Sequence, residues 1–298
     1  MEKKSIVYFT SKITPESLVK IYDVFHKELK GKVAVKLHSG EPGNQNFLHP
    51  EFFKDIIEHV QGTVVECNTA YEGKRNTSLK HKETLIKHGW SELFAVDLLD
   101  EDGPDMELPI ENGQIIHKNY VGKNLKNYDS MLVLSHFKGH PMGGFGGALK
   151  QLSIGVASSA GKAYIHSAGK TANQYDLWNH STPQNDFLMA MADAASSVVK
   201  YFHQEMIFIN VMKNMSVDCD CCAVAEDPCM KDVGILASLD PIALDQACVD
   251  LVYQSQDEGK NKLIERIESR NGLLTIEAAE KLHFGSREYI LKSLEEEF

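Results

Sequence analysis

Four of the six cysteines lie within eleven residues, and this density is the clearest chemical signal in the chain. The four are Cys219, Cys221, Cys222 and Cys229. Thiolates are strong ligands for soft metal ions, and a cysteine cluster in a cytoplasmic chain is explained more readily by metal or redox chemistry than by structural disulfides. We therefore expect at least two of these residues to bind a metal ion or an iron–sulfur cluster.

The spacing of this cluster differs from common metal-binding patterns, in which two residues separate paired cysteines. One residue separates Cys219 from Cys221, so on an extended segment both would face one side and Cys222 the other. The aspartates and Pro228 favour an irregular loop, where a turn could bring three or four sulfurs together. The alternative is that one or two of the cysteines are buried as small hydrophobic residues.

A second segment with reactive side chains follows an apolar strand expected at residues 131–134. It contains His136, Lys138 and His140. Gly139 and Pro141 oppose a helix that would place both histidines on one face. We interpret the three side chains as catalytic groups that contact a ligand, and the alternative is that they only bond to neighbouring backbone.

Glycines around Phe145 precede a helix expected at residues 148–152. They leave backbone N–H groups unobstructed, so a phosphate or carboxylate could bind at the helix start near Lys150. The pattern is neither a dinucleotide-binding fingerprint nor a nucleotide-hydrolysing loop. The glycines expected to contact the ligand are Gly143, Gly144, Gly146 and Gly147.

Two polar loops, at residues 39–47 and 68–76, carry further side chains of the kind that bind small polar ligands. Arg75 is the expected clamp for a carboxylate or phosphate. His166 is a third histidine candidate, after a strand-like run at residues 163–165. The alternative is that asparagines and glycines only satisfy turns. The other ligand-binding candidates in these loops are Glu41, Asn44 and Asn68.

The composition is that of a globular protein: 298 residues, 43% of them hydrophobic and 24% charged. A net charge of -11 disfavours binding to nucleic acid or to anionic membranes. The first apolar run, residues 6–9, is too short for a signal segment or a membrane span, so we expect a cytoplasmic protein. The expected partner is a small anionic molecule or a redox partner protein, and the sequence does not indicate the oligomeric state.

Apolar runs and amphipathic segments alternate along the chain. Strands are expected at 5–10, 32–37, 63–67 and 94–98, and helices at 15–29, 50–60 and 78–88. A hairpin is expected between residues 100 and 119, and later elements at 186–202, 206–211 and 234–236. This alternation predicts an α/β fold, a sheet with covering helices and motif loops at the carboxyl ends of the strands. We expect the chain to form one unit, 1–298, and the alternative is a unit with two lobes, at about 1–125 and 126–298.

Five separated phrases of the sequence together resemble the prokaryotic domain-of-unknown-function family 362, over about residues 33–253. They lie at residues 40–44, 68–71, 135–150, 218–221 and 232–246. The resemblance implies an iron–sulfur association, because relatives are often fused to ferredoxin-type modules. This chain has no such repeat, so a 4Fe-4S cluster would have to use the four clustered cysteines, and a histidine or Asp218 is a further candidate ligand. Cys219 and Cys221 match the family phrase.

These observations lead to one main hypothesis and two alternatives. The main hypothesis is a redox-type protein that binds an iron–sulfur cluster or another metal and acts on a small anionic ligand. The first alternative is a hydrolase or isomerase that depends on zinc or another divalent metal. The second is a carrier of a cluster or metal without catalytic activity.

Overall fold

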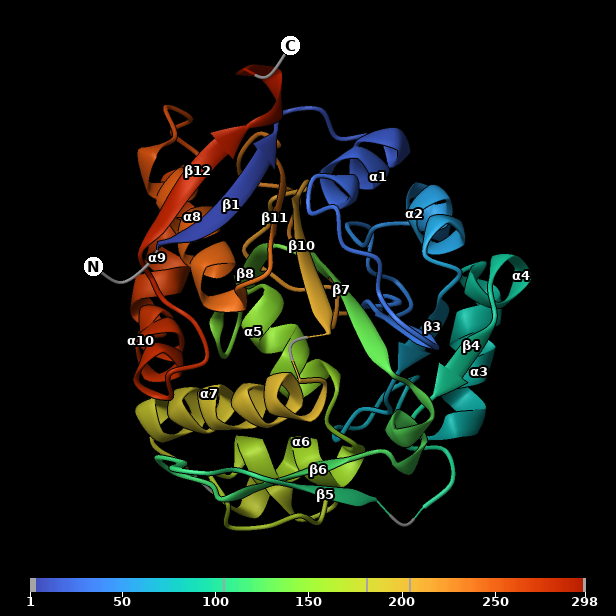
Figure 1. Cartoon of the computed structure of the whole chain (residues 1–298). Helices are drawn as coiled ribbons and strands as arrows, with labels where there is room; N and C mark the ends of the chain where they lie inside the picture. Colours follow the sequence, from blue (N-terminus) through green and yellow to red (C-terminus); the bar gives the residue numbers. More distant parts are fainter. Residues whose placement is uncertain (1–3, 104, 181, 204, 297–298) are drawn as a thin grey trace.

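The computed structural model describes residues 4–103, 105–180, 182–203 and 205–296, and its centre is an eight-stranded sheet (Figure 1). The strand order is β12-β1-β11-β10-β7-β2-β3-β4. All neighbouring pairs are parallel except those of β11, which runs antiparallel to β10 and β1. The strands are β1 Ser5–Thr10, β2 Val33–Lys36, β3 Thr63–Glu66, β4 Val96–Leu98, β7 Ser130–His136, β10 Met206–Met212, β11 Gly234–Ser238 and β12 Tyr289–Ser293.

The direction in which strands are added to the sheet reverses between β2 and β7. From β2 the chain adds β3 and β4 toward one edge, whereas β7 and β10 lie on the other side of β2. In a parallel sheet such a reversal opens a crevice at the carboxyl ends of the two strands, because the following segments diverge to opposite faces. This topology selects the carboxyl ends of β2 and β7 as the place for a ligand.

Side chains of the central strands alternate between two hydrophobic cores, one on each face of the sheet. In β7, Leu132 and Leu134 pack into one core, and Met131 and Val133 pack into the other. Both faces are covered, so the strand is apolar from Met131 to Leu134 and does not alternate with polar residues there.

Helices cover both faces (Figure 1). One core includes residues of α1 Pro15–Asp23, α2 Lys54–His59, α3 Ser78–Lys87 and α4 Trp90–Leu93. The other includes residues of α5 Ala148–Lys150, α7 Gln184–Tyr201, α8 Pro241–Gln254, α9 Lys260–Ser269 and α10 Leu273–Lys281. Helix α6 Ser159–His166 and the hairpin of β5 Met106–Pro109 and β6 Lys118–Val121 pack outside α7. Within the described ranges, no helix is both long and apolar enough to cross a membrane.

The expected α/β fold is confirmed, and three local expectations need correction. The first helix ends at Asp23 and not near residue 29, because the chain turns out of it through His26, which has a φ of 45°. The strand-like run at 163–165 is part of α6, which Ser158 caps by accepting from the N–H of Gly161. The helix that begins at Ala148 continues as a π-helix, Gln151–Gly155. Strands from both sides of residue 125 share the sheet, and a division into two lobes stays a prediction.

A buried carboxylate of the protein itself caps α5. The two oxygens of Asp245 accept from the N–H groups of Ala148 and Leu149 at 2.8 and 2.9 Å, and Oδ1 also accepts from Asn210 at 2.7 Å. A Cβ on Gly147 would lie 2.4 Å from Asp245 Oδ1, so glycine is needed for the close approach. Asp245 occupies the N–H groups of Ala148 and Leu149, so an anion at this helix start would need other groups, and the expected anion site stays a prediction.

The Asp245 cap predicts a loss of stability on amide substitution. In Asp245→Asn the side-chain NH₂ faces one of two backbone N–H groups, which leaves a buried donor unpaired at a cost of about 1–3 kcal/mol. Urea unfolding should show this decrease in the free energy of unfolding. The matched control, Asp102→Asn, changes an exposed aspartate whose side chain forms no hydrogen bond within the described residues, and it should stay within about 0.5 kcal/mol. Equal effects in the two variants would refute the capping role.

Candidate functional site

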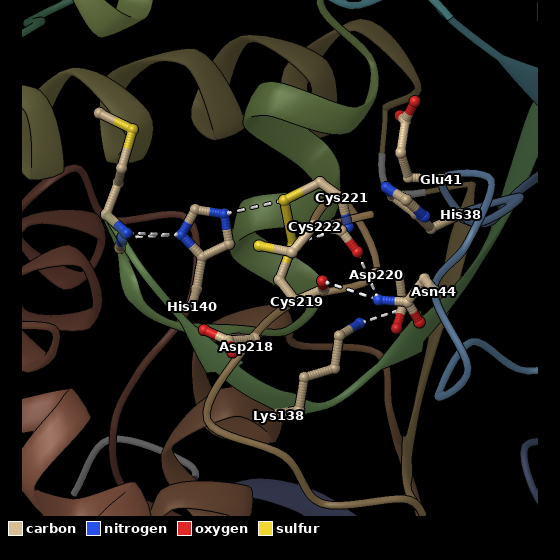
Figure 2. The surroundings of a disulfide bond; sticks show 12 residues. His38, Glu41, Asn44, Lys138, His140, Asp218, Cys219, Asp220, Cys221 and Cys222 are labelled. Carbon is tan, nitrogen blue, oxygen red and sulfur yellow. Dashed lines mark hydrogen bonds and ion pairs between the residues drawn. A yellow bond between two sulfur atoms is a disulfide. The ribbon is translucent and has the colours of Figure 1, made fainter. Parts of the chain in front are cut away.

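The sequence-predicted segments converge at the carboxyl ends of β2, β3, β7 and β10. His38 follows β2 and Cys67 follows β3. Residues 213–233, which we call the cysteine loop, follow β10. After β7 the chain forms a small antiparallel hairpin of β8 Lys138–His140 and β9 Gly144–Gly146. This hairpin carries His140 over the crevice between β2 and β7 and brings it to the cysteine loop (Figure 2).

The hydrogen bonds of His140 determine which of its ring nitrogens carries a proton. Nδ1 accepts from the N–H groups of Met142 and Gly143 at 3.1 and 2.8 Å. Burial, and next the charge of Lys150, hold the pKa of His140 well below its usual range. The ring is therefore neutral, and its one hydrogen is on Nε2. Nε2 lies 3.8 Å from Cys221 Sγ, so His140 presents an N–H to this sulfur.

Cys219 and Cys221 form the sulfur centre. Their sulfurs are bonded as a disulfide, and the N–H of Cys221 donates to Cys219 Sγ at 3.2 Å. His140 Nε2 and the two sulfurs all lie within 4.8 Å of one another, an arrangement that could hold a metal ion. The structure thus brings together two of the four predicted cysteines and one predicted histidine.

The other two clustered cysteines lie outside this group. Cys229 Sγ donates to the carbonyl of Met215 at 3.2 Å. Burial raises the pKa of Cys222 and of Cys229, which disfavours the thiolate that a metal needs. Metal binding by Cys222 and Cys229 stays a prediction.

His136 and Lys138 are bonded to Asp220 within the cysteine loop. Asp220 accepts from His136 Nδ1 at 3.0 Å and from Lys138 Nζ at 2.6 Å, and His136 Nε2 donates to the carbonyl of Lys213 at 2.5 Å. Burial alone would raise the pKa of Asp220, but the charges of His136 and Lys138 hold it well below its usual range. Both nitrogens of His136 face acceptors, so these two side chains position the cysteine loop.

Two more predicted residues hold the neighbouring loops together. Asn44 Nδ2 donates to the carbonyls of Cys219 and Cys222 at 3.3 and 2.8 Å. Glu41 accepts from Arg75 Nε at 2.8 Å, and both side chains are buried. Asn68 bonds to Asp100 and Ser78 and is not among the residues that line the cavity described below. Glu41 and Asn44 thus act on the protein's own groups.

A cavity of about 120 Å³ lies beside the sulfur centre. Cys221 and His140 form one wall, and Ala70, Ile154 and Leu177 form an apolar part. Its described lining contains four basic side chains and one carboxylate, namely Lys36, Arg75, Lys150 and Lys162 against Glu66. This excess of basic side chains favours an anionic ligand.

The predicted ligand residues differ in how close they come to this cavity. Arg75, Lys150 and His166 line it. Gly146 and Gly147 line a neighbouring hollow of about 30 Å³, which shares His38, His140 and Lys150 with the cavity. The N–H of Gly143 donates to His140 Nδ1. Gly144, with a φ of 81°, packs against Gly272. Ligand binding by all these residues stays a prediction.

Sequence reasoning missed four lining residues, Lys36, His38, Glu66 and Lys162. Lys36 is fully buried and donates to Glu66 Oε2 at 2.6 Å. A signal for both was available, because each is the charged last residue of a strand that is otherwise apolar. Lys162 gives no such signal, since it lies within a helix and its burial depends on packing.

The network of Asp220 predicts a large loss of stability in Asp220→Asn. The substitution leaves the charge of Lys138 buried without its partner, which costs about 3–5 kcal/mol. Adding Lys138→Met removes that charge and should restore most of the loss, which urea unfolding of both variants would measure. A double variant as unstable as Asp220→Asn would contradict the pairing.

Comparisons with known proteins add a family but no activity. No curated protein matches the chain in sequence. A lactate racemase apoprotein structure from Thermoanaerobacterium thermosaccharolyticum shares 16% identity and a TM-score of 0.41, over 68% of this chain and 50% of that one. A Thermotoga maritima protein structure shares 9% identity and a TM-score of 0.43, over 90% and 59%. This chain therefore spans about half to three fifths of those chains. The family model described as "Domain of unknown function (DUF362)" matches residues 33–250, and the chain belongs to this family.

Proposed function

We propose that this protein binds a small anionic molecule in the lysine-lined cavity and holds one soft metal ion beside it, in a redox-type function. One observation carries the proposal. The sulfur of Cys221 lies within 4.8 Å of the sulfur of Cys219 and of a ring nitrogen of His140. Cys221 also lines the same cavity as Lys150. A metal held there would have the bound anion as its neighbour.

The residues present fit a metal bound by two thiolates. Cys219 and Cys221 would be the ligands once their sulfurs are reduced. His140 fits a different role, since its Nδ1 accepts two backbone N–H groups and its Nε2 keeps a hydrogen. It would donate N–H···S to the Cys221 thiolate, and hydrogen bonds to ligating sulfurs tune the potential of a metal centre. Two protein ligands leave open positions for a ligand, as in catalytic metal sites.

A 4Fe-4S cluster on this chain alone does not fit the arrangement. Such a cluster takes four cysteine ligands, whereas Cys222 and Cys229 lie outside the group around Cys221. Cys229 already donates its thiol to a carbonyl. The form that we propose is therefore a single redox-active ion, iron, and not a cluster.

A metal-free redox couple is the second candidate, and the bond between Cys219 and Cys221 favours it. In this form the two thiols would lose two electrons and two protons to an external disulfide, which is reduced to two thiols. The N–H of His140 would stabilise the thiolate of Cys221 in the reduced state.

Metal analysis of cysteine variants separates these candidates. The protein is purified anaerobically, and iron, zinc, nickel and acid-labile sulfide are measured per chain with the visible spectrum. We expect close to one metal ion without sulfide, and its loss in Cys219→Ser and in Cys221→Ser.

Cys229→Ser is the matched control and should keep the metal, because this cysteine lies outside the group. Sulfide in amounts equal to iron, or loss of metal in Cys229→Ser, would contradict the single-ion site. A metal-free protein that gains two titratable thiols on reduction, with no such gain in the Cys219→Ser variant, would establish the redox couple instead.

A further inference from the structure

Lys150 differs from the other lysines around the cavity in having no partner. Lys36 Nζ donates to Glu66 at 2.6 Å, and Lys162 Nζ donates to the carbonyl of Ala157 at 2.5 Å. Lys138, which lines the adjoining hollow, is paired with Asp220. Within the described part of the chain, no hydrogen bond or ion pair to Lys150 Nζ is formed. Structural roles account for three of the amines and leave this one unused.

The backbone that carries Lys150 is fixed. Lys150 is the last residue of α5, whose first N–H groups are bonded to the carboxylate of Asp245. Its half-buried side chain lines both the cavity and the adjoining hollow. A functional group on a capped, buried helix is held more precisely than one on a surface loop.

The surroundings of Lys150 favour the neutral amine. Burial, and next the charge of Lys138, lower its pKa to about 7, and Lys162 and Lys36 act in the same direction. Asp220 opposes them. A lysine that is desolvated beside other cations is available as a nucleophile at neutral pH, whereas an exposed lysine is protonated.

His166 adds an uncommitted imidazole to the same cavity. Its Nδ1 is buried and has no hydrogen-bond partner among the described residues, and the ring stacks on Phe187 with centroids 4.7 Å apart. Burial, and next the charge of Lys150, lower the pKa of His166 to about 3, so the ring is neutral. A buried polar atom without a partner needs an explanation, and a carbonyl oxygen of a bound molecule could accept a hydrogen bond from this ring.

We propose that Lys150 forms an imine with a small oxo acid that enters the cavity. The lone pair of Nζ attacks the carbonyl carbon, the two amine protons pass to the carbonyl oxygen, and water leaves as the C=N bond forms. The reaction needs no oxidant or reductant. His166 would bond to the carbonyl oxygen, and the excess of cationic side chains would attract the carboxylate.

The size of the cavity sets the substrate class. One water needs about 10–15 Å³ of such cavity volume, so a cavity of about 120 Å³ has room for all non-hydrogen atoms of an oxo acid of two to four carbons. The inference rests on the proposed function in one respect, that the cavity takes a small anion. It does not depend on the cysteine centre.

Reductive trapping tests the proposal. The full-length protein is incubated with pyruvate and sodium cyanoborohydride at pH 7.5, and peptide mass analysis gives the rate of alkylation of every lysine. We expect Lys150 to be labelled at least tenfold faster than Lys12, which is exposed. Lys150→Arg should lose the fast label while its thermal unfolding stays close to that of the wild type. Labelling of Lys150 no faster than Lys12 would overturn the proposal.

Two controls separate this inference from the proposed function. The Cys219→Ser/Cys221→Ser variant should be labelled at Lys150 as fast as the wild type, and a rate reduced to that of Lys12 would overturn the inference that the amine acts without the sulfur centre. With acetone, a ketone without a carboxylate, the ratio of the labelling rate of Lys150 to that of Lys12 should be lower than with pyruvate. Equal ratios for the two probes, both well above one, would support an imine at Lys150 and refute the anion binding of the proposed function.

Discussion

Positive charge buried at the carboxyl ends of the central parallel strands is the constraint on which the rest of this structure depends. An ammonium group removed from water needs a partner or loses its proton, whereas a guanidinium keeps its proton and therefore always needs a partner. Three such groups have carboxylate partners, since Lys36 pairs with Glu66, Arg75 with Glu41 and Lys138 with Asp220. These ion pairs join β2 to β3, the two polar loops to each other and β8 to the cysteine loop.

The same ion pairs determine where chemistry can occur. The pairs lie at the carboxyl ends of the strands, where the strand order reverses. Two of them use side chains that sequence reasoning assigned to a ligand, namely Arg75 with Glu41 and Lys138 with Asp220. Lys150, His166 and the Cys219–Cys221 centre take no part in these three ion pairs, so they are the groups that we expect to contact a ligand. His140 links the two halves of the site, because its ring lies between the N–H groups of Met142 and Gly143 and the sulfur of Cys221.

Much of this architecture could be predicted from the sequence. The alternation of apolar strands and amphipathic helices gave the α/β fold, and strand ends located the loops that converge. The sequence could not predict side-chain partners that are far apart along the chain. Asp245 caps α5 from about a hundred residues after Ala148, and this contact depends on tertiary packing. The run at 163–165 is short and apolar, and such a run is compatible with both a strand and a helix. Periodicity alone could therefore not distinguish the two.

The cysteine cluster shows the same limit in the site itself. Its spacing identified four candidate ligands but not which of them meet, because one turn of an irregular loop decides that. The loop conformation is set by Asp220 and Asn44, which bond to side chains and carbonyls on both sides of Cys219. The tautomer of His140 likewise depends on the backbone of the glycine segment, which sequence patterns do not specify.

The most direct test of this account is a crystal structure of the anaerobically purified protein soaked with pyruvate, with anomalous diffraction data collected at the edge of the metal that it contains. The account predicts an anomalous peak at the sulfurs of Cys219 and Cys221, and density for the oxo acid continuous with Lys150 Nζ in the cavity. A metal bound elsewhere, or an oxo acid found only outside the cavity, would contradict it.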